Sequence, residues 1–139
     1  MKILLITLSL LLLVACASTE HESAASSYSL AKVGEAAGKA LEKTANTTEF
    51  YLSNIPPGTT AEPKVILKFI RDCRTARQAG AIACDRLDAI FEVVQAALSE
   101  SKDERFDGLV LIIVSAKKDP VRFDALLLPR GIKPIYAIY

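Results

Sequence analysis

Histidine is almost missing from this chain, which limits the chemistry that it can perform. The 139 residues include one histidine, His21, and it lies in a polar stretch without an apolar period. A general base needs neighbours that fix its orientation, so we interpret His21 as a solvated side chain. A glycine-rich phosphate loop and a Gly-x-Ser-x-Gly nucleophile motif are also absent from the sequence. We therefore predict a protein without enzymatic activity, without a cofactor and without a bound metal.

An excess of charge of either sign is missing as well. Lysine and arginine number 17, and aspartate and glutamate number 16. A balanced chain has no bulk electrostatic attraction to nucleic acid, so we predict no nucleic-acid partner. Carboxylates are available for acid–base catalysis at Asp103, Glu104 and Asp107. They lie in a polar run with no sign of the burial that separates the pKa values of a catalytic pair.

Apolar runs long enough to cross a membrane are missing too, and the longest apolar run lies near the start. The run from Ile3 to Val14 follows the positive charge of Lys2. It is about a dozen residues long, whereas a membrane-spanning helix needs about 20. A positive start, a short apolar core and small residues after it are typical of a secretory signal peptide. We predict that residues 1–15 are such a signal.

The motif Leu13-Val14-Ala15-Cys16 ends this run and resembles the lipobox of bacterial lipoproteins. In that family the cysteine sulfur receives a diacylglycerol and the signal is cut just before the cysteine. The new amino group is often acylated as well, with a fatty acid such as palmitate. The resemblance implies that Cys16 is lipidated, and several acyl chains together make a lasting anchor. The simpler interpretation is an ordinary signal peptide that ends in a chance cysteine.

The residues after Cys16 bear on location and on domain boundaries. In the family pattern an aspartate directly after the cysteine retains the protein in the inner membrane, and here Ala17 follows. The resemblance therefore implies an outer-membrane anchor facing the periplasm, with the periplasmic face of the inner membrane as the alternative. The small, polar residues up to position 27 predict a flexible tether. Residues 16–27 are then lipidated cysteine and tether, and residues 28–139 one globular domain.

The first half of this domain shows helical spacing with one strand. We predict a helix over Tyr28–Lys43. A strand is predicted over Glu49–Ile55 and ends at Pro56-Pro57. A helix that begins at Glu62-Pro63 is ended by Gly80, and another runs from Ile82 to Ser99. Because their link is short, these two helices are expected to form an antiparallel hairpin.

The second half of the domain is predicted to be a sheet. Gly108–Ala116 is an unbroken apolar run, typical of a strand covered on both faces. Val121–Leu127 alternates apolar and polar residues, and Ile132–Tyr139 forms a last strand in which Pro134 favours an edge position. The predicted fold is α+β: helix, strand and helical hairpin, then a three-stranded antiparallel meander with the helices on one sheet face.

Two cysteines remain besides Cys16. Cys73 and Cys84 lie on either side of the expected helical break, in an exported and oxidising setting. In a helical hairpin they approach to disulfide distance, and we predict a structural bridge that adds roughly 2–3 kcal/mol. A redox pair is disfavoured because Cys-x-x-Cys spacing is absent. A metal site is disfavoured because no histidine accompanies the pair.

The two hairpin helices carry charge of opposite sign on their outer faces. The simpler interpretation is two solvated faces, whose ion pairs contribute about 0–1 kcal/mol each. The alternative is a patch that binds a protein partner. The candidate residues for this patch are Lys64, Lys68, Arg71 and Arg74 on the basic face, and Asp85, Asp88 and Glu92 on the acidic face.

These features predict a lipid-anchored, non-enzymatic interaction module in the periplasm. It would act as an accessory or assembly subunit of an envelope complex, or as an immunity-type inhibitor of a toxin. Its expected partners are the membrane, through the anchor, and a protein. The alternative is a carrier of a lipid or small apolar ligand, with a pocket lined by Phe50, Tyr51 and Phe69. A filled core is the simpler interpretation of these aromatic residues, because protein interiors are close-packed.

Overall fold

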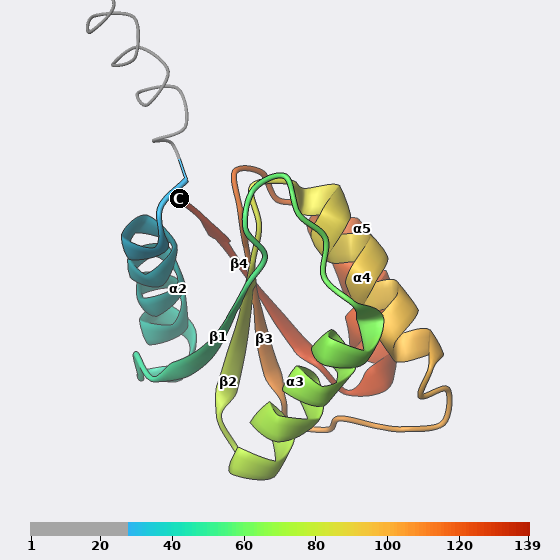
Figure 1. The fold of residues 1–139 in the computed structure, drawn as a ribbon. Coiled ribbons are helices and arrows are strands. Elements are labelled where there is room, and N and C mark those ends of the chain that lie inside the picture. Colours follow the sequence, from blue (N-terminus) through green and yellow to red (C-terminus); the bar gives the residue numbers. More distant parts are fainter. Residues whose placement is uncertain (1–27) are drawn as a thin grey trace, which may run out of the picture.

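Strands and helices alternate along the chain in the computed structural model, which describes residues 28–139. The predicted signal peptide, the tether with His21, and the lipidation site Cys16 lie outside these residues. The elements run in the order α2 (Leu30–Ala45), β1 (Phe50–Asn54), α3 (Pro63–Ala76), β2 (Ala79–Ala83), α4 (Leu87–Ser99), β3 (Val110–Ser115), α5 (Pro120–Leu127), the 3-10 turn η1 (Leu128–Arg130) and β4 (Lys133–Ile138) (Figure 1). Across residues 28–139, no helix is long and apolar enough to cross a membrane.

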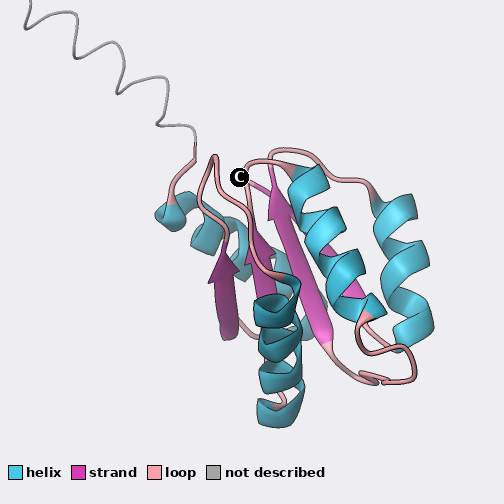
Figure 2. Cartoon of the chain, turned by 45° about the vertical axis from the view of Figure 1, so that its right-hand side comes forward, coloured by secondary structure: helices cyan, strands magenta, loops and turns pink. Residues whose placement is uncertain are grey.

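The four strands form one sheet in the order β1-β2-β3-β4, and every neighbouring pair is parallel. A crossover between parallel neighbours is right-handed. Three successive crossovers in the same direction therefore bring α3, α4 and α5 to one face of the sheet. Helix α2 lies alone on the other face (Figure 1). Figure 2 shows the resulting layers, with helices on both sides of the strands.

The core has two parts, one on each side of the sheet. Ile82, Leu111 and Ile113 point toward α3, α4 and α5 and belong to the larger cluster. The next residues along the strands point the other way, toward the buried side chains of α2. This second cluster is built largely from small residues, so a single thin helix fills it. Its members are Val33, Ala37, Leu41, Ala81, Ala83, Ile112, Val114, Ile135 and Ala137.

The predicted antiparallel meander and helical hairpin are wrong. Ala79–Ala83, assigned from the sequence to the hairpin link and the next helix, is strand β2 in the middle of the sheet. Its sequence AGAIA has no period of its own, and it is a strand because β1 and β3 bond to both of its edges. Val121–Leu127, predicted as a strand, belongs to helix α5. Pro120 opens that helix, and the Asp119 side chain caps it by accepting from the backbone N–H of Arg122.

Other predicted elements are confirmed. The first helix, the first strand and the helix opened by Pro63 are present as α2, β1 and α3. The apolar run near Gly108 is strand β3, and five of its six residues are buried. Pro134 lies in β4, at an edge of the sheet as predicted. These segments carry a clear period or a long apolar run, and such signals depend little on the rest of the fold.

The predicted disulfide between Cys73 and Cys84 is not formed, and both thiols are free and buried. Cys73 in α3 packs directly on Gly80, where an added Cβ would lie 2.8 Å from its sulfur. Cys84 follows the opposite end of β2. Cys84 lies four residue steps beyond Gly80 along the strand, a length of about 13 Å. A disulfide needs Cα atoms within about 7 Å, so strand β2 holds the two sulfurs apart.

Candidate functional site

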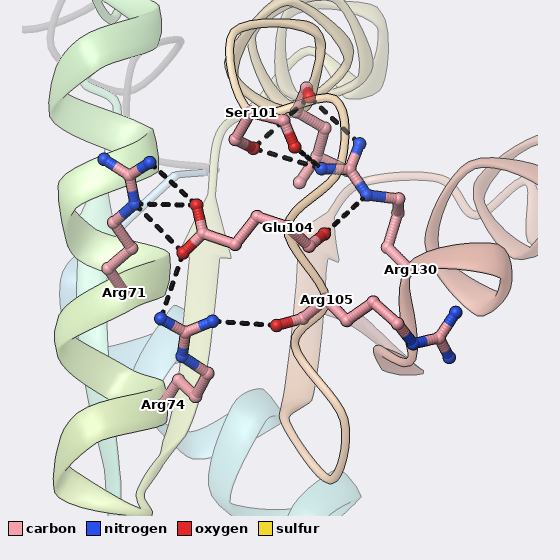
Figure 3. Close-up of polar contacts among 7 residues, drawn as sticks. Arg71, Arg74, Ser101, Glu104, Arg105 and Arg130 are labelled. Carbon is pink, nitrogen blue, oxygen red and sulfur yellow. Dashed lines mark hydrogen bonds and ion pairs between the residues drawn. The ribbon is translucent and has the colours of Figure 1, made fainter.

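Two of the predicted partner-binding arginines are used inside the molecule (Figure 3). Arg71 Nη2 lies 2.7 Å from Glu104 Oε2, and Arg74 Nη2 lies 3.0 Å from Glu104 Oε1. These bonds join α3 to the loop that follows α4. The hydrogen bond from Arg71 is the main reason that the pKa of Glu104 lies below its ordinary value. Glu104 therefore stays ionised, which makes it a poor general acid.

The same loop is held from its other side by Arg130 (Figure 3). Its guanidinium donates to the Glu104 carbonyl at 3.0 Å and to the Leu98 carbonyl at 2.9 Å. It also donates to the backbone and the hydroxyl of Ser101. The remaining two carboxylates considered for catalysis are exposed: Asp107 is paired with Arg105 at 2.8 Å, and Asp103 has no ion pair among residues 28–139. This cluster braces a loop and brings no acid–base pair together.

The other predicted partner-binding residues do not form one patch. Lys68 pairs with Asp72 on its own helix at 2.5 Å, and Asp88 pairs with Arg122 of α5 at 2.6 Å. Lys64, Asp85 and Glu92 have no ion pair within the described part of the chain. Lys64, Lys68 and Arg71 line a shallow groove of about 460 Å³. The acidic residues Asp85 and Asp88 line a different groove, so the predicted meeting of basic and acidic faces does not occur.

The second groove, of about 510 Å³, lies where β2 and β3 end and α4 and α5 begin. The carboxyl ends of parallel strands are a common place for ligands. Here the lining has both signs of charge in nearly equal number, which favours no ligand of one sign. The charged lining residues are Asp85, Arg86, Asp88, Lys117, Lys118, Asp119 and Arg122. Within residues 28–139, no group of histidine, cysteine, aspartate or glutamate side chains is arranged to hold a metal.

The buried thiols are also poor nucleophiles. Burial raises the pKa of Cys73 to about 11, and burial likewise raises the pKa of Cys84. A thiol reacts as its thiolate, so both groups are inert near neutral pH. Cys73 forms part of a pocket of about 440 Å³ at the amino ends of the strands. Because the raised pKa keeps the Cys73 thiol protonated, this pocket is not a good candidate for a cysteine-based active site.

The described chain enters the domain at the carboxyl edge of the sheet. The Tyr28 hydroxyl donates to the side-chain oxygen of Asn54, the last residue of β1. The Tyr28 ring meets the Tyr139 ring edge to face, with centroids 5.2 Å apart. Burial is the main reason that the pKa of Tyr28 rises to about 12, and Cys84, Tyr139 and Asp85 add to the effect. Tyr28 therefore fixes the start of the described chain beside the carboxyl ends of β1 and β4.

Among residues 28–139, strand β1 has no neighbouring strand on its outer side. The Ile55 N–H donates inward to the Ala83 carbonyl at 2.8 Å. Backbone groups alternate in direction along a strand, so the N–H and C=O groups of Phe50, Leu52 and Asn54 point outward. Two large side chains of this strand are exposed to solvent: Tyr51 by 47% and Leu52 by 37%.

Helix α3 extends this apolar region. Arg71 and Arg74 face the loop that follows α4, so the opposite flank of α3 lies toward β1. That flank carries Val65, which is 57% exposed, and Phe69, which packs against Gly80 beside Tyr51. We give the name β1 edge surface to the exposed side chains Tyr51, Leu52 and Val65, the partly buried Phe69 and the outward backbone of β1.

Sequence reasoning missed the β1 edge surface, although one signal was available. The segment FYLSN contains neither proline nor charge. Edge strands usually carry such residues, because they block pairing with other chains. Whether a strand lies at an edge, however, depends on the order of strands in the sheet.

The structure disfavours the carrier hypothesis. Phe50 and Tyr51 are consecutive strand residues, so their side chains point to opposite faces of the sheet and do not line one pocket.

Comparison with protein-family models, with curated proteins and with solved structures finds no match to this chain. Function is therefore argued from the sequence motif near the start and from the chemistry of the described residues. Among the described residues, that chemistry consists of two charged grooves, a braced loop and an unpaired strand edge.

Proposed function

We propose that the protein is a non-enzymatic interaction module, held by lipid on Cys16 at the periplasmic side of the outer membrane. The lipobox-like motif supports the anchor, and Ala17 after the cysteine supports the outer membrane over the inner. The observation that carries the interaction role is the β1 edge surface. It combines outward backbone donors and acceptors with exposed apolar side chains, which is the chemistry of a protein-binding edge.

The position of Tyr28 determines where the proposed tether joins the domain. About a dozen residues separate Cys16 from Tyr28, a reach of at most roughly 40 Å. Tyr28 is fixed to Asn54 and packed on Tyr139 at the carboxyl edge of the sheet. That edge is therefore where the proposed tether joins the domain.

Two partner types remain within the proposal: a subunit of an envelope complex, for which this protein is an accessory or assembly factor, and a toxin, for which it is an immunity-type inhibitor. The competing function is a carrier of a lipid or small apolar ligand. The filled clusters on both sheet faces disfavour that carrier, and the pocket of about 440 Å³ at the amino ends of the strands includes the charged residues Arg74, Arg77 and Asp107 in its lining.

The anchor is tested by the intact mass of the protein extracted from membranes. We expect the mass of the chain that begins at Cys16, increased by acyl chains. A Cys16→Ser variant should lose this addition and leave the membrane fraction, whereas the control Ser18→Ala should behave as the unmodified protein. An unlipidated, soluble product of the unmodified gene would refute the anchor and would favour a free periplasmic protein.

A further inference from the structure

We propose that the carboxyl edge of the sheet docks on the surface of an anionic phospholipid bilayer. The contact is made by exposed lysines and exposed apolar side chains, which together we name the carboxyl-edge surface. Its members are Leu30, Lys32, Lys117, Lys118, Val121 and Ile138. This inference deepens the proposed function and rests on its claim of a membrane anchor, and it concerns a different surface from the β1 edge.

Three exposed apolar side chains lie at this edge. Leu30 begins α2 and is 57% exposed, Val121 lies in the first turn of α5 and is 82% exposed, and Ile138 ends β4 and is 53% exposed. The Tyr136 hydroxyl bonds to the Pro120 carbonyl at 3.3 Å, which places the start of α5 beside the last residues of β4. The apolar side chains are therefore distributed over both faces of the sheet at one end of it.

Lysines lie at the same end. Lys117 and Lys118 follow β3, whose last residue Ser115 pairs with Ile138, so their loop lies beside the end of β4. Lys32 lies in the first turn of α2. All three lysines are exposed, and none forms an ion pair with a described residue. Each exposed lysine close to an anionic bilayer strengthens the attachment.

The acidic residues of the neighbouring groove are less available than these lysines. Asp88 pairs with Arg122 at 2.6 Å, and Asp119 lies 3.5 Å from the same guanidinium. Asp85 is partly buried, unlike the three lysines. The groove alone favours no ligand of one sign, but the exposed, unpaired charge at this end of the sheet is mainly basic.

The point where the proposed tether joins the domain indicates that a bilayer is the occupant. Tyr28 is fixed at this edge by its contacts with Asn54 and Tyr139. An anchor on Cys16, about a dozen residues earlier, keeps Tyr28 within roughly 40 Å of the bilayer. The amino edge of the sheet lies farther from the point of attachment. Tethering gives the carboxyl edge a high local concentration at the bilayer, so weak contacts are enough for docking.

A protein partner fits the carboxyl-edge surface less well. Lysine is depleted at the core of protein interfaces, whereas here lysines accompany the apolar side chains. On a bilayer, lysine ammonium groups meet lipid phosphates while neighbouring apolar side chains enter the boundary between headgroups and acyl chains. The mixture of residue types therefore favours a lipid surface.

The test couples the chain of residues 16–139 to vesicles that contain a maleimide-bearing phospholipid. Cys73 and Cys84 are buried thiols with raised pKa values, so we expect coupling at Cys16. The sequence contains no tryptophan, and one introduced tryptophan therefore reports on a single position. A tryptophan in contact with lipid is quenched by brominated acyl chains.

Val121→Trp is the reporter of docking. We expect brominated lipid to quench its emission about twofold or more in vesicles that contain phosphatidylglycerol, and little in vesicles of phosphatidylcholine alone. High salt should reduce this quenching, because salt screens the attraction between lysine and lipid. The matched control is Leu128→Trp, which alters an exposed residue at the opposite end of α5 and should be quenched little by either lipid.

Charge reversal locates the contact in the Val121→Trp protein. Lys117→Glu together with Lys118→Glu should lower the ratio of docked to undocked protein about tenfold or more, because attraction becomes repulsion. The control is Lys102→Glu together with Lys133→Glu. It makes the same change in net charge at two exposed positions, after α4 and at the start of β4, and should leave docking unchanged.

Three outcomes would overturn the proposal. One is the absence of quenching at Val121→Trp on vesicles with phosphatidylglycerol. Another is equal quenching at Leu128→Trp, which would mean that no face is preferred. The third is equal loss of docking in the two charge-reversed proteins, which would mean an effect of net charge alone. Coupling at Cys16 replaces the natural lipid, so these results do not depend on lipidation in the cell. Failure of the anchor, detected by intact mass, remains distinguishable from failure of docking.

Discussion

The two edge strands of the sheet are protected to very different degrees. Strand β4 carries Lys133 and Pro134, and both of its faces are in contact with helices, α2 on one side and α5 on the other. The Lys133 N–H bonds inward to Leu109, so the nitrogen of Pro134 points outward. The proline thus removes an outward donor without breaking the ladder.

Strand β1 is less protected, although α2 and α3 contact its two faces. Its five residues include no proline and no charge, and Tyr51 and Leu52 remain exposed. Natural proteins protect exposed edges because unpaired strands recruit other chains. A chain that protects one edge and leaves the other open is therefore consistent with use of the open edge for binding, and the following four predictions test this contrast.

The largest expected effect on stability concerns the alternation of inward and outward backbone N–H groups along β1. Ser53→Pro removes an N–H that points inward to β2 and should lower the free energy of unfolding by about 3 kcal/mol or more. Leu52→Pro removes an outward N–H and should cost about 1 kcal/mol or less. Urea denaturation of both variants measures the difference. Equal losses would contradict the assignment of inward and outward residues.

The next effect concerns the tyrosine that holds β4 to α5. The Tyr136 hydroxyl donates to Asp124 Oδ1 at 2.6 Å, and hydrogen bonds to charged groups contribute about 1.5–3 kcal/mol. Tyr136→Phe should therefore destabilise the protein by about 1–2 kcal/mol, since Asp124 is partly solvated. Thermal or urea unfolding measures this loss. An unchanged stability would mean that water replaces the hydroxyl without cost.

A related effect concerns the tyrosine that holds the carboxyl end of β1. Tyr28→Phe removes the bond to Asn54 and should cost about 1 kcal/mol. Folding raises the pKa of Tyr28 from 10.0 to about 12, mainly through burial, so the unfolded chain loses this proton first. The stability contributed by the neutral hydroxyl is complete below pH 10 and is lost as the pH rises toward 12. The fall in stability over this range should be smaller in Tyr28→Phe.

The smallest effect on stability comes from giving β1 the protection that β4 has. Leu52→Lys places a charge on a residue that is already 37% exposed, so the free energy of unfolding should change by about 0.5 kcal/mol or less. Urea denaturation measures this change. Loss of stability comparable to that of Ser53→Pro would mean that Leu52 belongs to the core.

The sequence predicted the elements that carry their own signal. Helix α3 follows from Pro63 and an apolar stripe, and strand β3 follows from its apolar run. The prediction from sequence was wrong for Ala79–Ala83, whose alanines suit a helix as well as a strand. It was also wrong for Val121–Leu127, where the alternation of apolar and polar residues was given more weight than the helix-start signal of Asp119-Pro120. Both errors replaced parallel crossovers with antiparallel turns.

The candidate site shows the same division. The periodic pattern of basic residues on α3 was visible in the sequence. Their partner Glu104 lies some thirty residues away along the chain, so their ion pairs with it could not be predicted from local spacing. The charged residues of the two helices were assigned to one patch because the hairpin was expected to join them. Strand β2 separates the two helices along the chain and removes that patch.

The sequence by itself determined which segments bury an apolar face, because residue spacing reports directly on helix and strand periods. It also determined the lipobox-like motif, which depends on local residues alone. Only the tertiary structure decided that Cys73 and Cys84 lie apart, that β2 is a central strand, and that β1 ends the sheet with its outer groups unpaired. Each of these depends on hydrogen bonds between segments distant in sequence, and no local pattern specifies which strand lies beside which.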